Sequence, residues 1–140
     1  MIDKTLVFDR LDRLGRYINE LEKLRDLGRE AFLSESRNIA AAESFLRRAL
    51  ESVFDVGRHV LARTGGAELA TEYKAIALGL GERQIVPKEL ADRLVLLAGY
   101  RNRLVHLYHL VSNEELWRTV ESDLGDLRRF INAMLIYVNS

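Results

Sequence analysis

Apolar residues in this sequence recur three and four positions apart along several long stretches, and a single proline interrupts them. This spacing places apolar side chains along one side of an α-helix, whereas a strand would need them at every second position. The helical spacing covers 3–25, 37–63, 87–110 and 113–138, and we find no stretch with the alternation of a strand. We therefore expect an all-α, up-and-down bundle of four long helices, with a short fifth helix over 68–78.

Residues that favour helix ends mark several borders of these stretches. Asp3 is suited to cap the first helix, and Ser34 or Ser36 is suited to cap the second. Pro87 fits the first turn of a helix, where its missing amide proton leaves no hydrogen bond unmade. Ser112, followed two residues later by a pair of glutamates, predicts the start of the last helix.

Composition narrows the class of protein. At 140 residues the chain is long enough for one domain with a core, so we expect a single domain over 1–140. Lysine plus arginine and aspartate plus glutamate number 21 each, so RNA binding would need a local basic patch rather than an overall positive field. There is no cysteine, which excludes thiolate metal sites. Because the N-terminus is charged and no apolar run reaches about 18 residues, we expect a cytoplasmic protein without a membrane span.

The stretch 87–110 is unusual because its apolar residues lie nearly all round the expected helix, which predicts a helix enclosed on several sides. Yet it contains the segment RNRLVHLYH, with many groups that are costly to bury. On a helical wheel most of these groups share one broad side. The members of this polar side are Arg101, Asn102, His106 and Tyr108.

The polar side has the parts of a small reactive site. Asn102 and His106 are four positions apart, within hydrogen-bond reach on a helix, and Arg103 falls on the opposite side. Arg101 and Tyr108 would lie one above the other, two turns apart. An imidazole can transfer a proton near neutral pH and an arginine fork can hold a phosphate. This set suits RNA cleavage through attack of the ribose 2′-hydroxyl, with no metal required.

An ordinary structural role is the alternative for the same residues. Arg101 would then pair with an acid on a neighbouring helix, and His106 would bond to a backbone carbonyl. Tyr108 would lie in the core with its hydroxyl reaching water. An arginine followed closely by a histidine is common enough by chance that the pair alone does not decide between the two interpretations.

The fuller pattern Arg-Asn-x-x-x-His-x-Tyr resembles the motif of the HEPN superfamily, in particular its HepT-like toxin family. The similarity extends over most of the chain, from the second expected helix to the end. The segments that carry it are DVGRHVLAR, VPKELADRL, GYRNRLVHLYHLVSNEELW and DLGDLRRFINAM.

This resemblance implies an α-helical, HEPN-like homodimer that acts as a metal-independent ribonuclease on tRNA or mRNA, with two arginine-histidine motifs facing one another in a cleft. Arg101 and His106 would be catalytic, Asn102 would be the polar residue that follows the arginine, and Tyr108 would complete the motif. The resemblance further implies a toxin-antitoxin pair, in which a minimal nucleotidyltransferase similar to MntA neutralises the toxin by attaching AMP to Tyr108. Some related helical domains only bind nucleotidyltransferases, so a non-catalytic subunit is the second hypothesis.

Other polar residues give weaker indications. Asp55 and His59 are four positions apart on the second helix, and the family pattern makes Asp55 a candidate for the cleft, although a solvated helix face is the favoured explanation of both residues. His106 and His109 are spaced for a metal, but no cysteine or nearby carboxylate completes a ligand set. We therefore expect no metal site and no cofactor.

Overall fold

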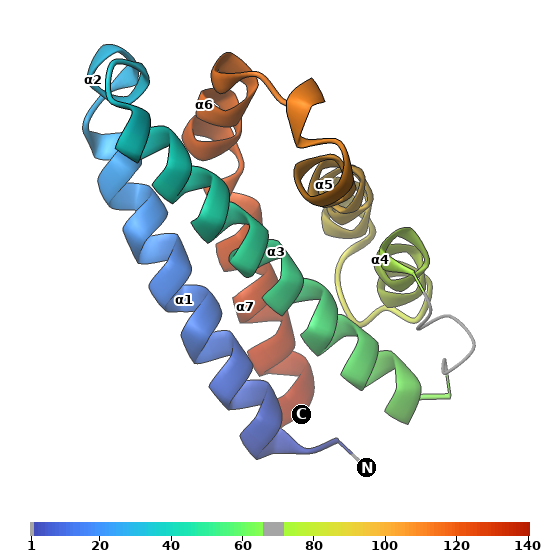
Figure 1. Ribbon diagram of the computed structural model, residues 1–140. Helices are drawn as coiled ribbons and strands as arrows, with labels where there is room; N and C mark the ends of the chain where they lie inside the picture. The colour runs from blue at the N-terminus through green and yellow to red at the C-terminus, as the bar shows by residue number, and fades with distance from the viewer. Residues whose placement is uncertain (1, 66–71) are drawn as a thin grey trace.

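The computed structural model describes residues 2–65 and 72–140, and within these ranges the secondary structure is entirely helical. The all-α architecture expected from the apolar spacing is therefore confirmed (Figure 1). The helices in chain order are α1 (Lys4–Asp26), α2 (Arg29–Leu33), α3 (Ser36–Arg63), α4 (Tyr73–Glu82), α5 (Lys88–His106), the 3-10 helix η2 (Tyr108–Leu110), α6 (Asn113–Ser122) and α7 (Leu124–Asn139).

The two longest helices, α1 and α3, lie antiparallel and side by side (Figure 1). Asp3 caps α1 as predicted, because its carboxylate accepts a hydrogen bond from the Leu6 amide at 3.1 Å. Burying one aliphatic side chain contributes about 1.5–3 kcal/mol, so a fully buried stripe holds such a helix firmly. The buried stripe of α1 has the predicted members Val7, Leu11, Leu14, Ile18 and Leu21.

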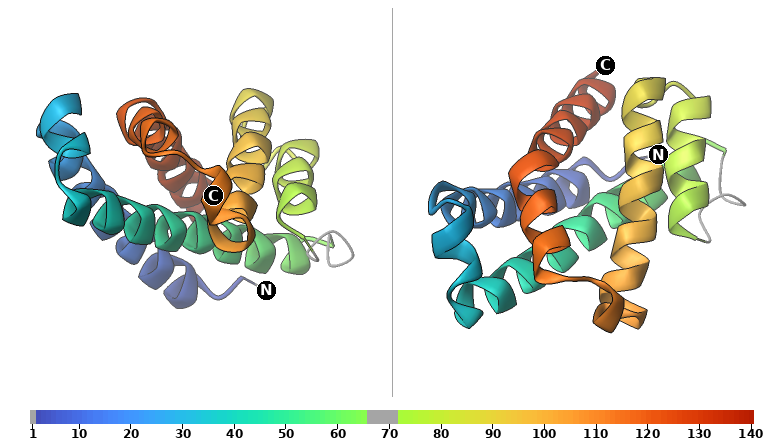
Figure 2. Two further views of the ribbon diagram at one scale, coloured as in Figure 1. Left: turned by 45° about the horizontal axis from the view of Figure 1, so that its top comes forward. Right: turned by 90° about the horizontal axis from the view of Figure 1, so that it is seen from above.

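The remaining long helices form a second layer over this pair (Figure 2). In that layer α4 and α5 form a helical hairpin, and α6 and α7 lie beside it. Two glycines allow neighbouring helices to pack closely: Gly57 on α3 lets α4 approach α3, and Gly81 on α4 lets α5 approach α4. A Cβ on Gly57 would lie 2.8 Å from a methyl group of Ile76 on α4, and one on Gly81 would lie 2.6 Å from the Cβ of Ala91 on α5.

The connection between α1 and α3 contains α2, a short helix that the sequence did not reveal. It buries Phe32, whose ring centre lies 5.2 Å from that of Trp117 on α6. The predicted serine cap of α3 is wrong, because Glu35 occupies the cap position and its carboxylate accepts from the Arg37 amide at 3.2 Å. A carboxylate satisfies the free amide groups of a helix start as well as a hydroxyl does.

The expected short helix and the expected last helix both differ from the structure. The described part of the short helix is α4, which continues to Glu82 rather than ending at 78, while 68–71 lie outside the described residues. The last helix begins after Ser112 as predicted, but it is divided at Asp123 into α6 and α7. Arg93 on α5 holds this break, donating to Asp123 at 3.0 Å and to Asp126 at 2.9 Å. Burial raises the pKa of Asp123, and the Arg93 guanidinium opposes that rise.

Candidate functional site

The helix that carries the polar motif ends earlier than its sequence indicates. We expected it to reach residue 110, but α5 ends at His106, and Leu107 leaves the helical region with φ −135° and ψ 41°. Leu104 is the last buried residue of α5, whereas Leu107 and Leu110 are 44% and 57% exposed. Because a further turn of helix would bury nothing, the chain instead turns through η2 towards α6.

The expectation that this helix is enclosed on several sides is wrong for the single chain. One side of α5 faces the core, but Leu96 on another side is 63% exposed. Asn102, His106 and Tyr108 are also exposed. These three polar residues of the motif are therefore exposed, and the protein does not surround α5 on all sides.

Arg101 is the exception within the motif, because its side chain is only 15% exposed. It reaches an acid on a neighbouring helix, as the structural alternative predicted. Its Nη2 donates to Glu51 on α3 at 3.3 Å, and the other carboxylate oxygen of Glu51 accepts from Arg47 at 3.3 Å. The guanidinium carbon also lies 4.5 Å from the centre of the Tyr73 ring at the start of α4.

Neither Glu51 nor Tyr73 was singled out as part of this site from the sequence. Glu51 has the spacing of an ordinary surface ion pair with Arg47 four residues before it, and that pair does exist. Tyr73 lies within the short helix expected over 68–78, and nothing in that expectation connected it with the motif. No sequence pattern links either residue to Arg101, because both come from other helices.

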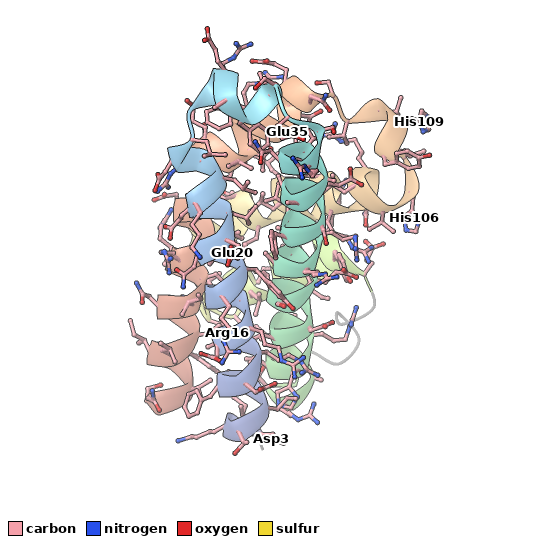
Figure 3. All side chains as sticks on the ribbon, turned by 60° about the vertical axis from the view of Figure 1, so that its left-hand side comes forward. Asp3, Arg16, Glu20, Glu35, His106 and His109 are labelled. Carbon is pink, nitrogen blue, oxygen red and sulfur yellow. The ribbon has the colours of Figure 1, made fainter. Side chains whose placement is uncertain are left out.

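His106 and Asn102 do not form the predicted pair. Both side chains are exposed, and no hydrogen bond between described residues joins them or ties His106 to a backbone carbonyl. His106 and His109 lie at the edge of the molecule, away from α1 and α3 (Figure 3). Arg101 and His106 are five positions apart, which separates them by about 140° around the helix. One chain therefore anchors the arginine against α3 and α4 and leaves the histidine open.

Tyr108 lies on η2 rather than above Arg101, because α5 has ended before it. Its side chain is 66% exposed, and its ring meets the ring of His109 edge-on with centres 6.1 Å apart. The prediction that Tyr108 lies above Arg101, two turns along one continuous helix, is wrong. The core placement offered by the structural alternative is also wrong, and the phenol hydroxyl is available to another molecule.

Arg103, which the helical wheel placed opposite the motif, links α5 to α6. It donates to Glu115 through two nitrogens, one at 2.9 Å, and it lies 5.4 Å from the ring centre of Tyr100. The Glu115 carboxylate raises the pKa of Arg103 further, so this guanidinium stays charged. Both partners belong to the helix packing, and Arg103 is not part of the polar side.

Asp55 and His59 are each engaged separately rather than with one another. Asp55 pairs with Arg58 at 3.3 Å, and His59 accepts a hydrogen bond from the Asp3 amide at 3.1 Å. Burial and the charge of Arg63 lower the pKa of His59, which keeps its ring available as an acceptor. Asp55 is exposed on α3, one turn beyond Glu51, and among the described residues it makes no hydrogen bond or ion pair with Arg101.

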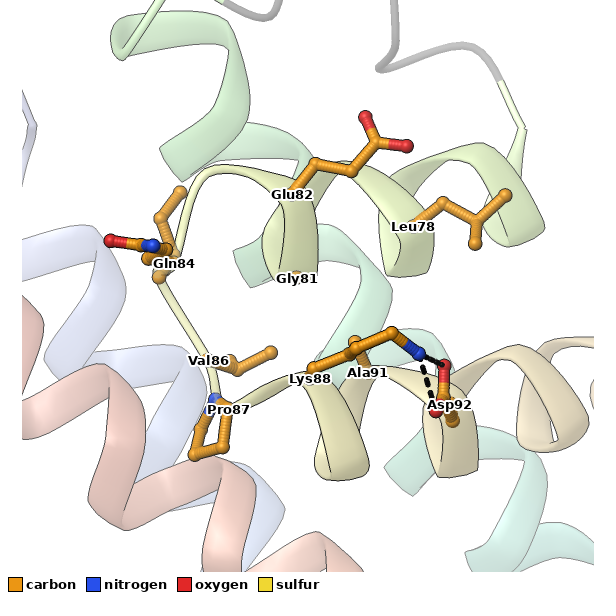
Figure 4. Close-up of a pocket in the computed structure, with 10 residues that line it drawn as sticks. Leu78, Gly81, Glu82, Gln84, Val86, Pro87, Lys88, Ala91 and Asp92 are labelled. Atoms are coloured by element: carbon orange, nitrogen blue, oxygen red, sulfur yellow. Dashed lines mark hydrogen bonds and ion pairs between the residues drawn. The ribbon is translucent and has the colours of Figure 1, made fainter.

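A hollow at the other end of α5 offers different chemistry (Figure 4). It lies between the end of α4 and the start of α5, and its lining contains neither histidine nor arginine. Lys88 and Asp92 on its rim pair with each other at 3.0 Å.

Within 2–65 and 72–140 no group of three His, Cys, Asp or Glu side chains is placed to hold a metal ion. None of the described helices has both the length and the apolar character to cross a membrane.

Comparison with known proteins gives consistent matches over nearly the whole chain. The family model described as "Ribonuclease HepT-like" matches residues 14–134. The protein described as tRNA nuclease HepT from Aphanizomenon flos-aquae (strain 2012/KM1/D3) is 25% identical over 137 residues, which is 98% of this chain and 92% of that protein.

Solved structures share the fold at low sequence identity. A tri-AMPylated HEPN toxin from Shewanella oneidensis, solved in complex with an MNT antitoxin, aligns with a TM-score of 0.83 at 20% identity, covering 97% of this chain and 99% of that one. YutE from Bacillus subtilis, a cytosolic protein of unknown function, aligns with a TM-score of 0.80 at 20% identity, covering 99% and 92%. These likenesses concern the arrangement of the helices.

Proposed function

Because this chain belongs to the HepT-like ribonuclease family, we propose that it is an endoribonuclease and the toxin of a toxin-antitoxin pair. The observation that carries the proposal is the contrast within the motif. Arg101 is held in place by α3 and α4, whereas His106, five residues later, is open to a substrate. A fixed cation beside an accessible imidazole suits charge stabilisation and proton transfer at a phosphate.

The proposed reaction uses the ribose next to the scissile phosphate. A neutral His106 takes the proton of the 2′-hydroxyl, and the oxygen attacks the adjacent phosphorus. The bond from phosphorus to the 5′-oxygen breaks, and a protonated imidazole returns a proton to that oxygen. Arg101 donates hydrogen bonds to the phosphate oxygens, whose negative charge increases in the transition state. Neither proton transfer requires a metal ion.

We propose that a second copy of the chain completes this site. Within one chain, Arg101 and His106 diverge by about 140° around α5. Two copies related by a two-fold axis along the open side of α5 would bring two arginines and two histidines together, so that one imidazole could act as base and the other as acid. The open side includes Leu96, which is 63% exposed and would be buried by such a partner.

We take tRNA as the first substrate to test, since the curated relative is described as a tRNA nuclease. The purified chain should cleave tRNA in EDTA, and Arg101→Ala and His106→Ala should each abolish cleavage. Arg16→Ala is a matched control, because Arg16 is 75% exposed on α1 and, among the described residues, pairs only with Asp12. No cleavage of tRNA or mRNA by the wild-type chain, or equal cleavage by all four proteins, would contradict the proposal.

The proposed antitoxin is a minimal nucleotidyltransferase that transfers AMP from ATP to Tyr108. Support comes from the exposed hydroxyl on η2 and from the related HEPN toxin, which is described as tri-AMPylated in complex with its antitoxin. The phenol oxygen would attack the α-phosphate of ATP and release pyrophosphate, adding negative charge two residues from His106. Intact-mass and peptide mass spectrometry with the cognate enzyme should find AMP on Tyr108 and none on the Tyr108→Phe protein.

A non-catalytic binding subunit is the second candidate, and one contact favours it. Arg101 already has a carboxylate partner in Glu51, so its charge is partly satisfied without any substrate. Under this candidate the wild-type chain would be inactive on RNA, while the transfer of AMP to Tyr108 would still occur. The cleavage and modification experiments together therefore separate the two functions.

A further inference from the structure

The guanidinium of Arg101 rests on a ring that the rest of the fold holds still. Its central carbon lies 4.5 Å from the centre of the Tyr73 ring. The Tyr73 ring is itself stacked on Phe54, with centres 4.7 Å apart and planes 14° from parallel. Phe54 is fully buried on α3. The core thus holds Phe54, Phe54 supports the ring of Tyr73, and the ring of Tyr73 supports the guanidinium of Arg101.

The nitrogen Nε of Arg101 indicates that this contact is imposed by the fold. It is buried and has no hydrogen-bond partner in the part of the chain that the structure describes. A buried donor without an acceptor is unfavourable, so an arginine that the fold did not constrain would adopt a rotamer that exposes its Nε to water. An aromatic face is a weak acceptor and attracts a cation, so it offsets part of that loss. Nε of Arg101 is therefore covered by the protein, and the two terminal nitrogens of the guanidinium remain for Glu51 and for a phosphate.

We propose that Tyr73 is a positioning residue for RNA cleavage, whose ring sets the plane of the Arg101 guanidinium. This inference rests on the proposed function of Arg101. The ring is the active part of Tyr73, since no hydrogen bond among the described residues uses its hydroxyl. Glu51 fixes one nitrogen by a single hydrogen bond at 3.3 Å, which orients the group less completely than a contact over the ring face does.

Arg58 also approaches the same ring, with its guanidinium carbon 5.7 Å from the centre. It is paired with Asp55 and lies farther from the ring than Arg101 does. Removing Arg58 should therefore leave the Arg101 contact in place. The variant Arg58→Ala tests whether Tyr73 acts through Arg101 or through this second arginine.

The experiment compares Tyr73→Phe, which keeps the ring, with Tyr73→Leu and Tyr73→Met, which remove it. Tyr17→Leu is the matched control, because Tyr17 is a partly buried tyrosine whose ring packs on Phe45 with centres 6.3 Å apart. The first measurement is the NMR signal of the Arg101 Nε proton, which a nearby ring face shifts to lower frequency. The second is kcat for tRNA cleavage.

The Arg101 signal should be shifted in the wild type, Tyr73→Phe, Arg58→Ala and Tyr17→Leu proteins, and it should move to the position of a free arginine in Tyr73→Leu and Tyr73→Met. The same two variants should lose kcat by about tenfold or more, because a misplaced cation stabilises the transition state less. Tyr73→Phe should retain the wild-type kcat.

An unshifted Arg101 signal in the wild type would overturn the inference even if no variant folded. Wild-type kcat in Tyr73→Leu would also overturn it, provided that Arg101→Ala is inactive. If the wild type cleaves no RNA, the proposed function fails, while the NMR comparison still decides whether Tyr73 positions Arg101.

Discussion

The two sides of α5 differ in composition as well as in surroundings, because its buried residues are all apolar and Leu96 is the one apolar residue among its exposed ones. The inner side buries residues such as Leu94 and Leu104 against the other helices, whereas Leu96 on the outer side is 63% exposed. The inner side keeps the helix in place, and the outer side remains available for a partner or a substrate. The motif lies where these sides meet, with Arg101 turned inward and His106 turned outward.

The largest expected difference between the two sides is in stability. Leu94 is fully buried, so Leu94→Ala should lower the free energy of unfolding by about 2–5 kcal/mol through lost burial and the cavity left behind. Leu96→Ala should change the stability of the single chain by no more than about 0.5 kcal/mol. Urea denaturation at low protein concentration measures both values.

Leu96 also tests the proposed second copy. Light scattering should give the mass of two chains for the wild type, and Leu96→Glu should shift the protein to single chains while its helical circular dichroism is retained. A wild-type protein that stays monomeric at micromolar concentration would remove the partner from the proposal. Equal losses of stability in Leu94→Ala and Leu96→Ala monomers would remove the distinction between the two sides.

The second difference appears at alkaline pH and concerns Tyr100 on the inner side. Burial raises the pKa of Tyr100 to about 12 from an ordinary value of 10.0. Thr119 lies near enough to oppose this rise, but its hydroxyl donates to the Glu115 carbonyl at 3.1 Å. The Tyr100 hydroxyl has no hydrogen-bond partner within 2–65 and 72–140. The unfolded chain therefore loses this proton at lower pH than the folded chain does.

It follows that the wild type should lose stability as pH rises from about 10 to 12, by about 2–3 kcal/mol in total from this group. Below pH 10 the hydroxyl is protonated in both states and contributes no such dependence. Tyr100→Phe should lack this loss, and urea denaturation at pH 8 and pH 11 measures the difference. Identical pH dependence in the two proteins would show that Tyr100 ionises as readily in the folded chain as in the unfolded one.

Much of the fold was predictable because helix packing follows local apolar spacing. The stripe of α1, its Asp3 cap and the start of α6 after Ser112 all depend on residues within one or two turns. The end of α5 was not predictable in this way. It depends on whether Leu107 and Leu110 find a partner surface, and no such surface exists within the described chain.

The candidate site was predictable only in part, for the same reason. Its motif is contiguous in sequence, so Arg101 and His106 could be named from their spacing and from the family resemblance. The residues that hold Arg101 come from α3 and α4, and their contacts depend on how three helices meet. The helical wheel also assumed a continuous helix, which is why it placed Tyr108 above Arg101 instead of on η2.

The smallest expected effect distinguishes Arg101 from Arg103 on α5. Arg103 reaches Glu115 with two nitrogens, but its side chain is 39% exposed, so solvent screens much of the pair. Arg103→Gln should therefore lower stability by no more than about 1 kcal/mol and leave RNA cleavage unchanged. Arg101→Gln should have a similarly small effect on stability, because Glu51 keeps Arg47 as a partner at 3.3 Å, yet it should abolish cleavage. Thermal unfolding and the tRNA assay on both proteins test this. Loss of cleavage in Arg103→Gln would mean that the link between α5 and α6 also shapes the site, and the separation of the two sides would then fail.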